Sequence, residues 1–251
     1  LRTILRQNVA GRLRVLIDEL EALPEDEDTH CNIIPLYLTF WLTTMYQEYG
    51  VPLLPRLSAA KHQLLKERDL LMATRVLSWS AQVRSTYAIQ LHQARQECLE
   101  ALALTEQMGA HTPWEGYLYY CLFVISYAWN RLEEAPDWLK RLRRLAQDWQ
   151  HMQLLAVTEV FSAQLGLAKG DLEEAEEALH QLEALLEQGG LAYHAPWVTV
   201  LRAKLWLARG NLAEAAAWAA QTTFSPAAWN PLRRWELLML VRVLVARQQY
   251  E

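Results

Sequence analysis

The stretch Gly170–Leu179, with the sequence GDLEEAEEAL, occurs three times in closely similar form in this chain. Forty residues earlier the chain carries NRLEEAPDWL, from Asn130 to Leu139, and forty residues later it carries GNLAEAAAWA, from Gly210 to Ala219. Self-similarity at a period between about 20 and 50 residues indicates an array of stacked structural units. The fold is therefore expected to follow from one unit that is repeated along the chain.

A leucine after the Gly or Asn marks each copy of the unit. It falls at Leu132, Leu172 and Leu212, and Leu91 fits the same slot 41 residues before Leu132. Tyr250 occupies the slot in a partial copy 38 residues after Leu212. The markers predict units of about 38–41 residues.

Each unit carries the signals of two helices joined by a short turn. Gly170 and Gly210 suit the left-handed position that ends a helix, and Asp171 and Asn211 suit the N-cap of the next one. Acidic residues follow in the first turn of that second helix, where the helix dipole favours negative charge. A turn this short makes the two helices antiparallel.

Small residues recur on both helices of the unit and predict close helix packing. Alanine stands three residues after each complete marker, at Ala94, Ala135, Ala175 and Ala215, and the preceding helix offers Ala163 and Ala203. No sustained period-two alternation or hairpin signal competes. The prediction is an all-α superhelical solenoid of antiparallel helix hairpins: a single array over residues 1–251, less regular in 1–70 and clearer in 71–251.

These residues resemble the tetratricopeptide repeat, or TPR. Ala163, Gly170, Ala175 and Leu179 match the small, glycine, alanine and large positions of that repeat. The chain departs from the pattern at Phe123, which is large where a small residue is usual, and the units are longer than the common repeat. The resemblance implies divergent TPR-like hairpins.

A narrower resemblance is spread over most of the chain. The segments 5–7 and 16–25, the latter containing EALPE, resemble the beginning of the helical region in MalT-like regulators, which are large bacterial transcription regulators of the LuxR type. The repeat units, followed by Tyr193, His194 and Trp197, resemble the later part of the same helical array. The resemblance implies a nucleotide-binding module before the array and a helix-turn-helix after it, with the array as sensor domain. The chain begins at Leu1 rather than Met, so we expect a fragment of such a protein.

Composition restricts the function classes. The net charge of −5 disfavours direct binding of nucleic acid, and the basic cluster Lys140–Arg144 is typical of a solvated helix face. Three scattered cysteines favour a reducing compartment. The most apolar run, 118–129, is shorter than the roughly 20 residues that span a bilayer. We expect a cytoplasmic protein that does not enter a membrane.

Signatures of enzymes, cofactors and metals are missing. The chain contains no P-loop, no H-E-x-x-H, no G-x-S-x-G and no G-x-G-x-x-G, so no cofactor is expected in this fragment. The acidic stretch 24–29 is interpreted as an inter-helix loop, and His30 beside Cys31 is no ligand set by itself. An all-α enzyme would need converging carboxylates, which the sequence lacks. We predict no catalytic and no metal residues.

The aromatic residues are the unusual feature, with 11 Trp and 10 Tyr against 4 Phe. Trp and Tyr add a polar edge that suits wet interfaces. In a TPR-like array the first helix of each hairpin lines the concave face, and the repeat register predicts these ligand-binding candidates there: Trp79, Tyr87, Tyr117, Tyr120, Tyr127, Gln164, Trp197, Lys204 and Arg242.

Three interpretations of this aromatic face remain open. It suits a small-molecule effector such as a sugar or planar molecule, which would make the chain the sensor domain of a regulator. The alternative function is a scaffold that binds a protein or peptide without an effector. In the third interpretation, some of the aromatic residues only pack neighbouring hairpins together. Trp138, Trp149 and Trp218 fall on second helices, away from the predicted face. Self-association through the array is a further expectation.

Overall fold

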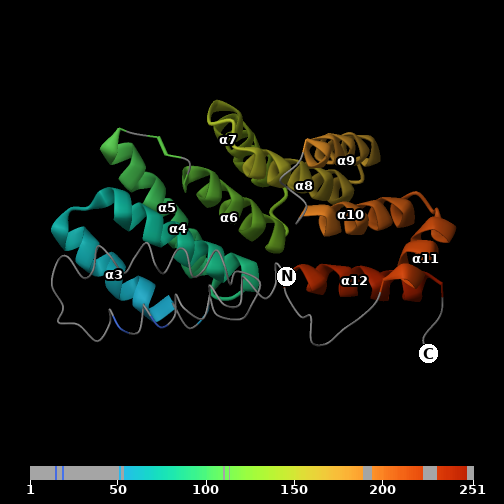
Figure 1. Ribbon diagram of the computed structural model, residues 1–251, viewed down its shortest axis with the longest axis horizontal. Coiled ribbons are helices and arrows are strands. Elements are labelled where there is room, and N and C mark those ends of the chain that lie inside the picture. The colour runs from blue at the N-terminus through green and yellow to red at the C-terminus, as the bar shows by residue number, and fades with distance from the viewer. Residues whose placement is uncertain are drawn as a thin grey trace. The chain divides into compact units, whose positions relative to one another are not determined.

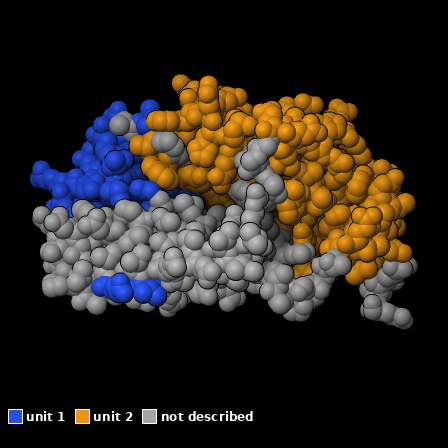
Figure 2. Space-filling view, viewed as in Figure 1, with its two compact units in different colours: residues 1–111 blue, residues 112–251 orange. Residues whose placement is uncertain are grey.

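The computed structural model describes residues 54–109, 111–112, 114–188, 194–222 and 231–247, with the isolated positions 15, 19 and 51. The chain divides into two compact units, residues 1–111 and 112–251, which Figure 2 shows in different colours. Within the described ranges the regular structure is helical, which confirms the all-α prediction. The EALPE segment, the acidic stretch 24–29, Cys31 and Tyr250 lie outside the described residues.

Unit 1 is built around helix α4. Its described helices are α3 (Leu54–Glu67), α4 (Leu70–Tyr87) and α5 (Leu91–Met108), and α4 packs against both of the others (Figure 1). Asp69 caps α4, with its carboxylate accepting from the Met72 N–H at 3.0 Å. Residues Ala73–Ser85 of α4 are buried at nearly every position, because this helix is apolar or small around most of its circumference.

Unit 2 is a two-layer array of helix hairpins (Figure 1). The hairpins are α6 (Trp114–Ala128) with α7 (Ala135–Asp148), α8 (Met152–Lys169) with α9 (Leu172–Glu187), and α10 (Ala195–Ala208) with α11 (Leu212–Gln221), followed by α12 (Pro231–Ala246). In the first layer α6, α8, α10 and α12 pack on one another in order. The second layer holds α7, α9 and α11. This is the predicted solenoid of antiparallel hairpins.

The helix-ending residues of the three hairpins share one backbone conformation. Asn130, Gly170 and Gly210 all have positive φ, at 56°, 81° and 77°, and they stand forty residues apart. Glycine adopts this left-handed region without a steric penalty, and Asn is among the few other residues that visit it. The predicted helix stops at Gly170 and Gly210 are confirmed.

The same turn also places one carbonyl group at an equivalent position in each hairpin. In each hairpin the residue after the left-handed position donates its N–H to a carbonyl oxygen near the end of the first helix. The pairs are Arg131 with Ser126, Asp171 with Gly166 and Asn211 with Trp206, at N···O distances of 2.8, 2.9 and 2.8 Å. This bond satisfies a carbonyl that the helix end leaves open. The residue at this position differs in every hairpin, and at Gly166 it faces the start of the second helix.

Each of the three second helices begins in a different way. Asp171 caps α9 as predicted, since its carboxylate accepts from the Glu174 N–H at 3.0 Å. Asn211 occupies the N-cap position of α11, but its side chain makes no capping hydrogen bond. Helix α7 starts at Ala135, so the marker Leu132 lies in the turn before it. The hairpins therefore share a turn position and differ in how the second helix is closed.

The closest approach within hairpin α8–α9 involves a residue that the repeat pattern did not single out. Ala163 and Ala175 are both buried, as expected of small packing residues. It is Gly166, however, that admits α9: a Cβ there would lie 2.8 Å from the Asp171 carbonyl oxygen and 2.9 Å from the Ala175 nitrogen. These distances are shorter than van der Waals contact, so this geometry requires glycine.

The core of unit 2 explains the large residue at position 123. Phe123 is fully buried and stacks on Phe161 of α8, with ring centroids 4.2 Å apart. An aromatic pair at this distance contributes about 0.5–1.5 kcal/mol beyond the apolar area that it buries. A large side chain is accommodated at position 123 because its ring stacks on a ring of the next hairpin.

Candidate functional site

The nine predicted residues all belong to first helices of hairpins or to α12, and the structure distributes them over both units. Trp79 and Tyr87 lie on α4 in unit 1. The other seven lie on α6, α8, α10 and α12, which form the first layer of unit 2. A candidate site is therefore built from the residues of unit 2.

Aromatic rings from α6 and α8 form a continuous row, here called the aromatic band, of Tyr120, Phe161, Phe123 and Tyr127. Successive ring centroids are separated by 5.1, 4.2 and 6.1 Å. The two Phe rings are buried, whereas Tyr120 and Tyr127 are half-buried at the two ends of the row. Both tyrosines therefore pack against the core on one side and retain exposed surface on the other.

Lys204 joins the aromatic band to the next hairpin but one. Its ammonium group donates to the Tyr127 hydroxyl at 3.4 Å, which links α10 directly to α6. In the first layer α8 packs against both α6 and α10, so this bond passes over α8. The half-buried Lys204 and Tyr127 therefore face the same side of the layer.

A second aromatic contact continues the layer toward α12. Trp197 of α10 and Trp235 of α12 are both half-buried, with ring centroids 6.1 Å apart. Trp235 was not among the predicted residues, although it precedes the predicted Arg242 by seven positions and so shares its helix face. Arg242 is exposed. Phe161 was missed as well, because its importance depends on its contact with Phe123.

Three predicted residues have surroundings that limit contact with a ligand. Trp79 is 2% exposed, beneath the Arg75 guanidinium at 5.0 Å from its ring centroid. Gln164 is 7% exposed. Tyr117 packs between Trp114 and His151, at centroid distances of 6.2 and 6.1 Å. In this structure Trp79 and Gln164 present almost no surface to a ligand.

The site offers phenol hydroxyl groups, one ammonium group and ring faces, and no metal centre. Within the described ranges no group of three or more His, Cys, Asp or Glu could hold a metal ion. The described cysteines, Cys98 and Cys121, are buried thiols. Half-buried aromatic rings with a few hydrogen-bonding groups are the kind of lining that ligand sites have.

Comparison with known proteins identifies the family. The family described as MalT-like TPR region matches residues 56–251. The chain belongs to this family. The match covers unit 2 and the described helices of unit 1 apart from the first residues of α3, and it confirms the MalT-like resemblance.

The relatives of this MalT-like TPR region are named HTH-type transcriptional regulator MalT. The protein from Cronobacter sakazakii is 29% identical over 193 residues, which are 75% of this chain and 19% of the relative. Those from Serratia proteamaculans and Yersinia pestis are 30% and 28% identical over 149 residues, or 58% and 57% of this chain and 16% of each relative. The chain thus spans about a fifth of the length of these regulators or less.

The relatives are named as transcriptional regulators, and none of these names is that of an enzyme. Among the described helices none is both long and apolar enough to cross a membrane.

Proposed function

We propose that this MalT-like TPR region is the effector-binding sensor segment of a bacterial transcription regulator. An effector held on the first layer of unit 2 biases assembly and DNA binding, which other domains of the parent protein carry out in the cytoplasm. The names of the relatives support the regulatory setting. The aromatic band supports the binding role, because it offers ring faces and hydrogen-bonding groups on one surface.

The observation that carries the proposal is the hydrogen bond between Lys204 and Tyr127. It connects helices that belong to different hairpins, and the two residues are 77 positions apart in sequence. A ligand that contacts Tyr120, Tyr127 and Lys204 would touch α6 and α10 at once. In an array where each hairpin contacts only its neighbours, such a ligand stabilises one relative placement of several hairpins. This is a physical route from binding to assembly.

The proposal is tested by ligand binding to the 251-residue chain. A panel of sugars, nucleotides and other small metabolites is screened by thermal shift, since a ligand that binds only the folded state raises the melting temperature. For any metabolite that shifts the wild type, Tyr120→Ala and Lys204→Met are each expected to weaken binding about tenfold in calorimetry.

Tyr119→Ala is the matched control. Tyr119 lies next to Tyr120 on α6, but it stacks on Trp138 of α7 at a centroid distance of 6.4 Å and so faces the other layer. Affinity in this variant should stay near the wild-type value. If Tyr120→Ala and Lys204→Met bind as well as the wild type, the site lies elsewhere. A complete absence of shifts with every metabolite would contradict the effector and favour a protein or peptide partner.

A further inference from the structure

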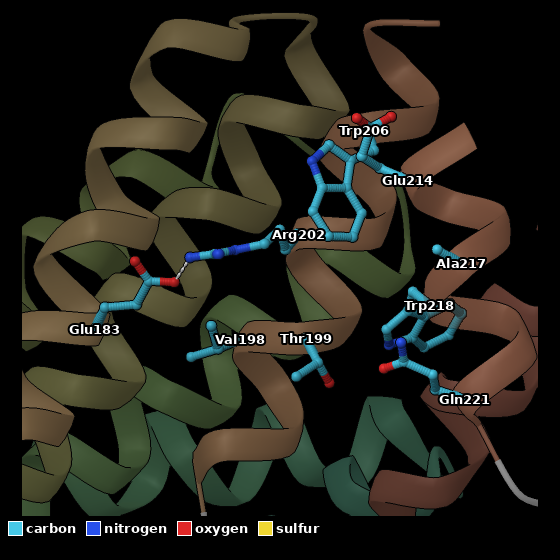
Figure 3. Close-up of a pocket in the computed structure, with 9 residues that line it drawn as sticks. All are labelled: Glu183, Val198, Thr199, Arg202, Trp206, Glu214, Ala217, Trp218 and Gln221. Atoms are coloured by element: carbon cyan, nitrogen blue, oxygen red, sulfur yellow. Dashed lines mark ion pairs between the residues drawn. The ribbon is translucent and has the colours of Figure 1, made fainter. Parts of the chain in front are cut away.

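Hairpin α10–α11 contains a pocket that is separate from the aromatic band. It has a volume of about 380 Å³ and is lined by residues of α9, α10 and α11 (Figure 3). Its apolar part includes the rings of Trp206 and Trp218, and its polar part includes Glu183, Arg202 and Glu214. This volume lies within the range of small-molecule sites, which is roughly 300–1,000 Å³. We call it the α10–α11 pocket.

The two tryptophans of the pocket replace small residues of the preceding hairpin. Forty residues before Trp206 stands Gly166, and forty residues before Trp218 stands Ala178. Gly166 and Trp206 are also equivalent in the structure, because each accepts the corresponding turn hydrogen bond of its hairpin. At Gly166 even a Cβ would collide with the backbone of the second helix. A tryptophan at this position requires a wider hairpin, and the Trp206 ring lines the pocket together with residues of α9 and α11.

The charges around the pocket leave one carboxylate uncompensated. Arg202 forms an ion pair with Glu183, which Figure 3 shows on the opposite side of the pocket from Trp218. Glu214 is exposed in the first turn of α11, and no described residue forms an ion pair with it. The lining therefore combines two indole rings with a net negative charge.

Indole faces and a carboxylate attract the same kind of group. The ring quadrupole of tryptophan favours a cation near its face, and a nearby carboxylate adds a direct Coulomb attraction. A neutral or anionic molecule of the same shape gains neither. We propose that the α10–α11 pocket binds an organic cation in which a flat apolar body is joined to an ammonium group. This site is independent of the aromatic band and of the function proposed for it.

The test uses phenethylammonium chloride as the probe and 2-phenylethanol as its neutral counterpart. The 251-residue chain is labelled with ¹⁵N at tryptophan, and the indole signals of Trp206 and Trp218 are assigned from the conservative variants Trp206→Phe and Trp218→Phe. We expect phenethylammonium to shift these two signals and 2-phenylethanol to bind about tenfold more weakly.

The charge is tested with Glu214→Gln, and the matched control is Glu174→Gln. Glu174 is the third residue of α9, as Glu214 is of α11, so both variants lose the same helix-dipole interaction. Of these two glutamates, only Glu214 lines the pocket. Glu214→Gln should weaken phenethylammonium binding about two- to fivefold, because Glu214 is exposed and its charge is screened by solvent, whereas Glu174→Gln should leave it unchanged.

Several results would overturn the proposal. One is equal binding of the two probes, and another is unchanged affinity in Glu214→Gln. A third is the absence of shifts at both indole signals at millimolar phenethylammonium. The unlabelled Glu214→Gln and Glu174→Gln variants are compared by melting temperature, so that a loss of binding is not confused with a loss of fold.

Discussion

The guanidinium group of Arg143 on α7 lies 3.1 Å from Oε2 of Glu159 on α8, and it also donates to the Ser162 hydroxyl at 2.7 Å. Forty residues later the same positions carry Glu183, Thr199 and Arg202, and Glu183 pairs with Arg202. In both repeats an ion pair connects the second helix of one hairpin to the first helix of the next. In the earlier repeat the second helix supplies the cation, and in the later repeat it supplies the carboxylate.

Removing the cation of the first pair should destabilise the chain. Glu159 is 6% exposed, and burial raises the pKa of its carboxyl despite the opposing effect of Arg143. Arg143→Met leaves this carboxylate buried without its cation. We expect a loss of about 1–3 kcal/mol in urea unfolding at pH 7, because Arg143 itself is partly solvated.

The pH dependence of that loss has a definite sign. In Arg143→Met the pKa of Glu159 rises further above its unfolded value, so the native state holds its proton to higher pH. Stability then falls as pH rises through this window, and the deficit relative to wild type should shrink on acidification. A deficit that grows toward low pH would contradict this assignment.

The reversed polarity of the next repeat supplies a rescue experiment. Arg143→Glu alone places two carboxylates together and should cost more than Arg143→Met. Adding Glu159→Thr and Ser162→Arg copies the Glu183, Thr199 and Arg202 arrangement and should recover most of the loss. If the triple variant is no more stable than Arg143→Glu, the two interfaces are not equivalent.

Gly166 should tolerate alanine less well than Gly170 does. A Cβ at Gly166 meets backbone atoms, which cannot move aside, and we expect Gly166→Ala to cost about 2–3 kcal/mol. Gly170 has φ +81° with nothing within 4 Å of a Cβ, so Gly170→Ala should cost only the left-handed penalty of about 1 kcal/mol. Urea unfolding of both variants measures the order, and the reverse order would refute the close-approach argument.

The two N-caps should respond differently to the same substitution. Asp171→Ala removes a 3.0 Å hydrogen bond to the Glu174 N–H and should cost about 1 kcal/mol. Asn211 makes no such bond, so Asn211→Ala should cost clearly less. Chemical denaturation of the pair decides the matter; equal losses would mean that the capping bond contributes nothing measurable.

His194 should make the chain sensitive to mild acid. This residue is 2% exposed, and burial lowers its pKa from 6.5 to about 4. Above pH 6.5 both folded and unfolded states are neutral. Between pH 6.5 and about 4 only the unfolded state binds the proton, so stability falls as pH falls, by about 3 kcal/mol over the window.

The control for this prediction is His194→Asn, which cannot titrate. The slope of unfolding free energy against pH between 6.5 and about 4 should be smaller in the variant than in the wild type. Identical slopes would show that other groups produce the acid sensitivity.

The regular features of the chain were predictable because they depend on neighbours in sequence. A left-handed residue at Gly170 and Gly210, an acidic cap at Asp171 and the apolar spacing of helices are decided within a few residues. The family resemblance was predictable for the same reason, since the repeat carries its own pattern. Asn211 shows the limit of such reasoning: its position was predicted, but its capping bond is absent.

The candidate sites depended on contacts that no local pattern contains. Phe161 and Trp235 became visible only through the rings that they touch, and Trp79 proved to be buried although its register suggested a surface. That the nine residues contact a ligand remains a prediction. That residues 1–251 form one continuous array remains a prediction as well. Trp218, which the repeat register places on a second helix and outside the predicted face, lines a pocket.

Hairpin boundaries, turn conformation and helix caps follow from the amino-acid sequence of this protein, because φ/ψ preferences and capping chemistry act over a handful of residues. Only the tertiary structure decided that Gly166 closes one hairpin while Trp206, at the equivalent position, lines an open one. Only the tertiary structure brought Lys204 to Tyr127. The reason is that the separation of two packed helices depends on the side chains of both facing surfaces. A repeat pattern describes the residues of each helix separately and does not show which side chains meet.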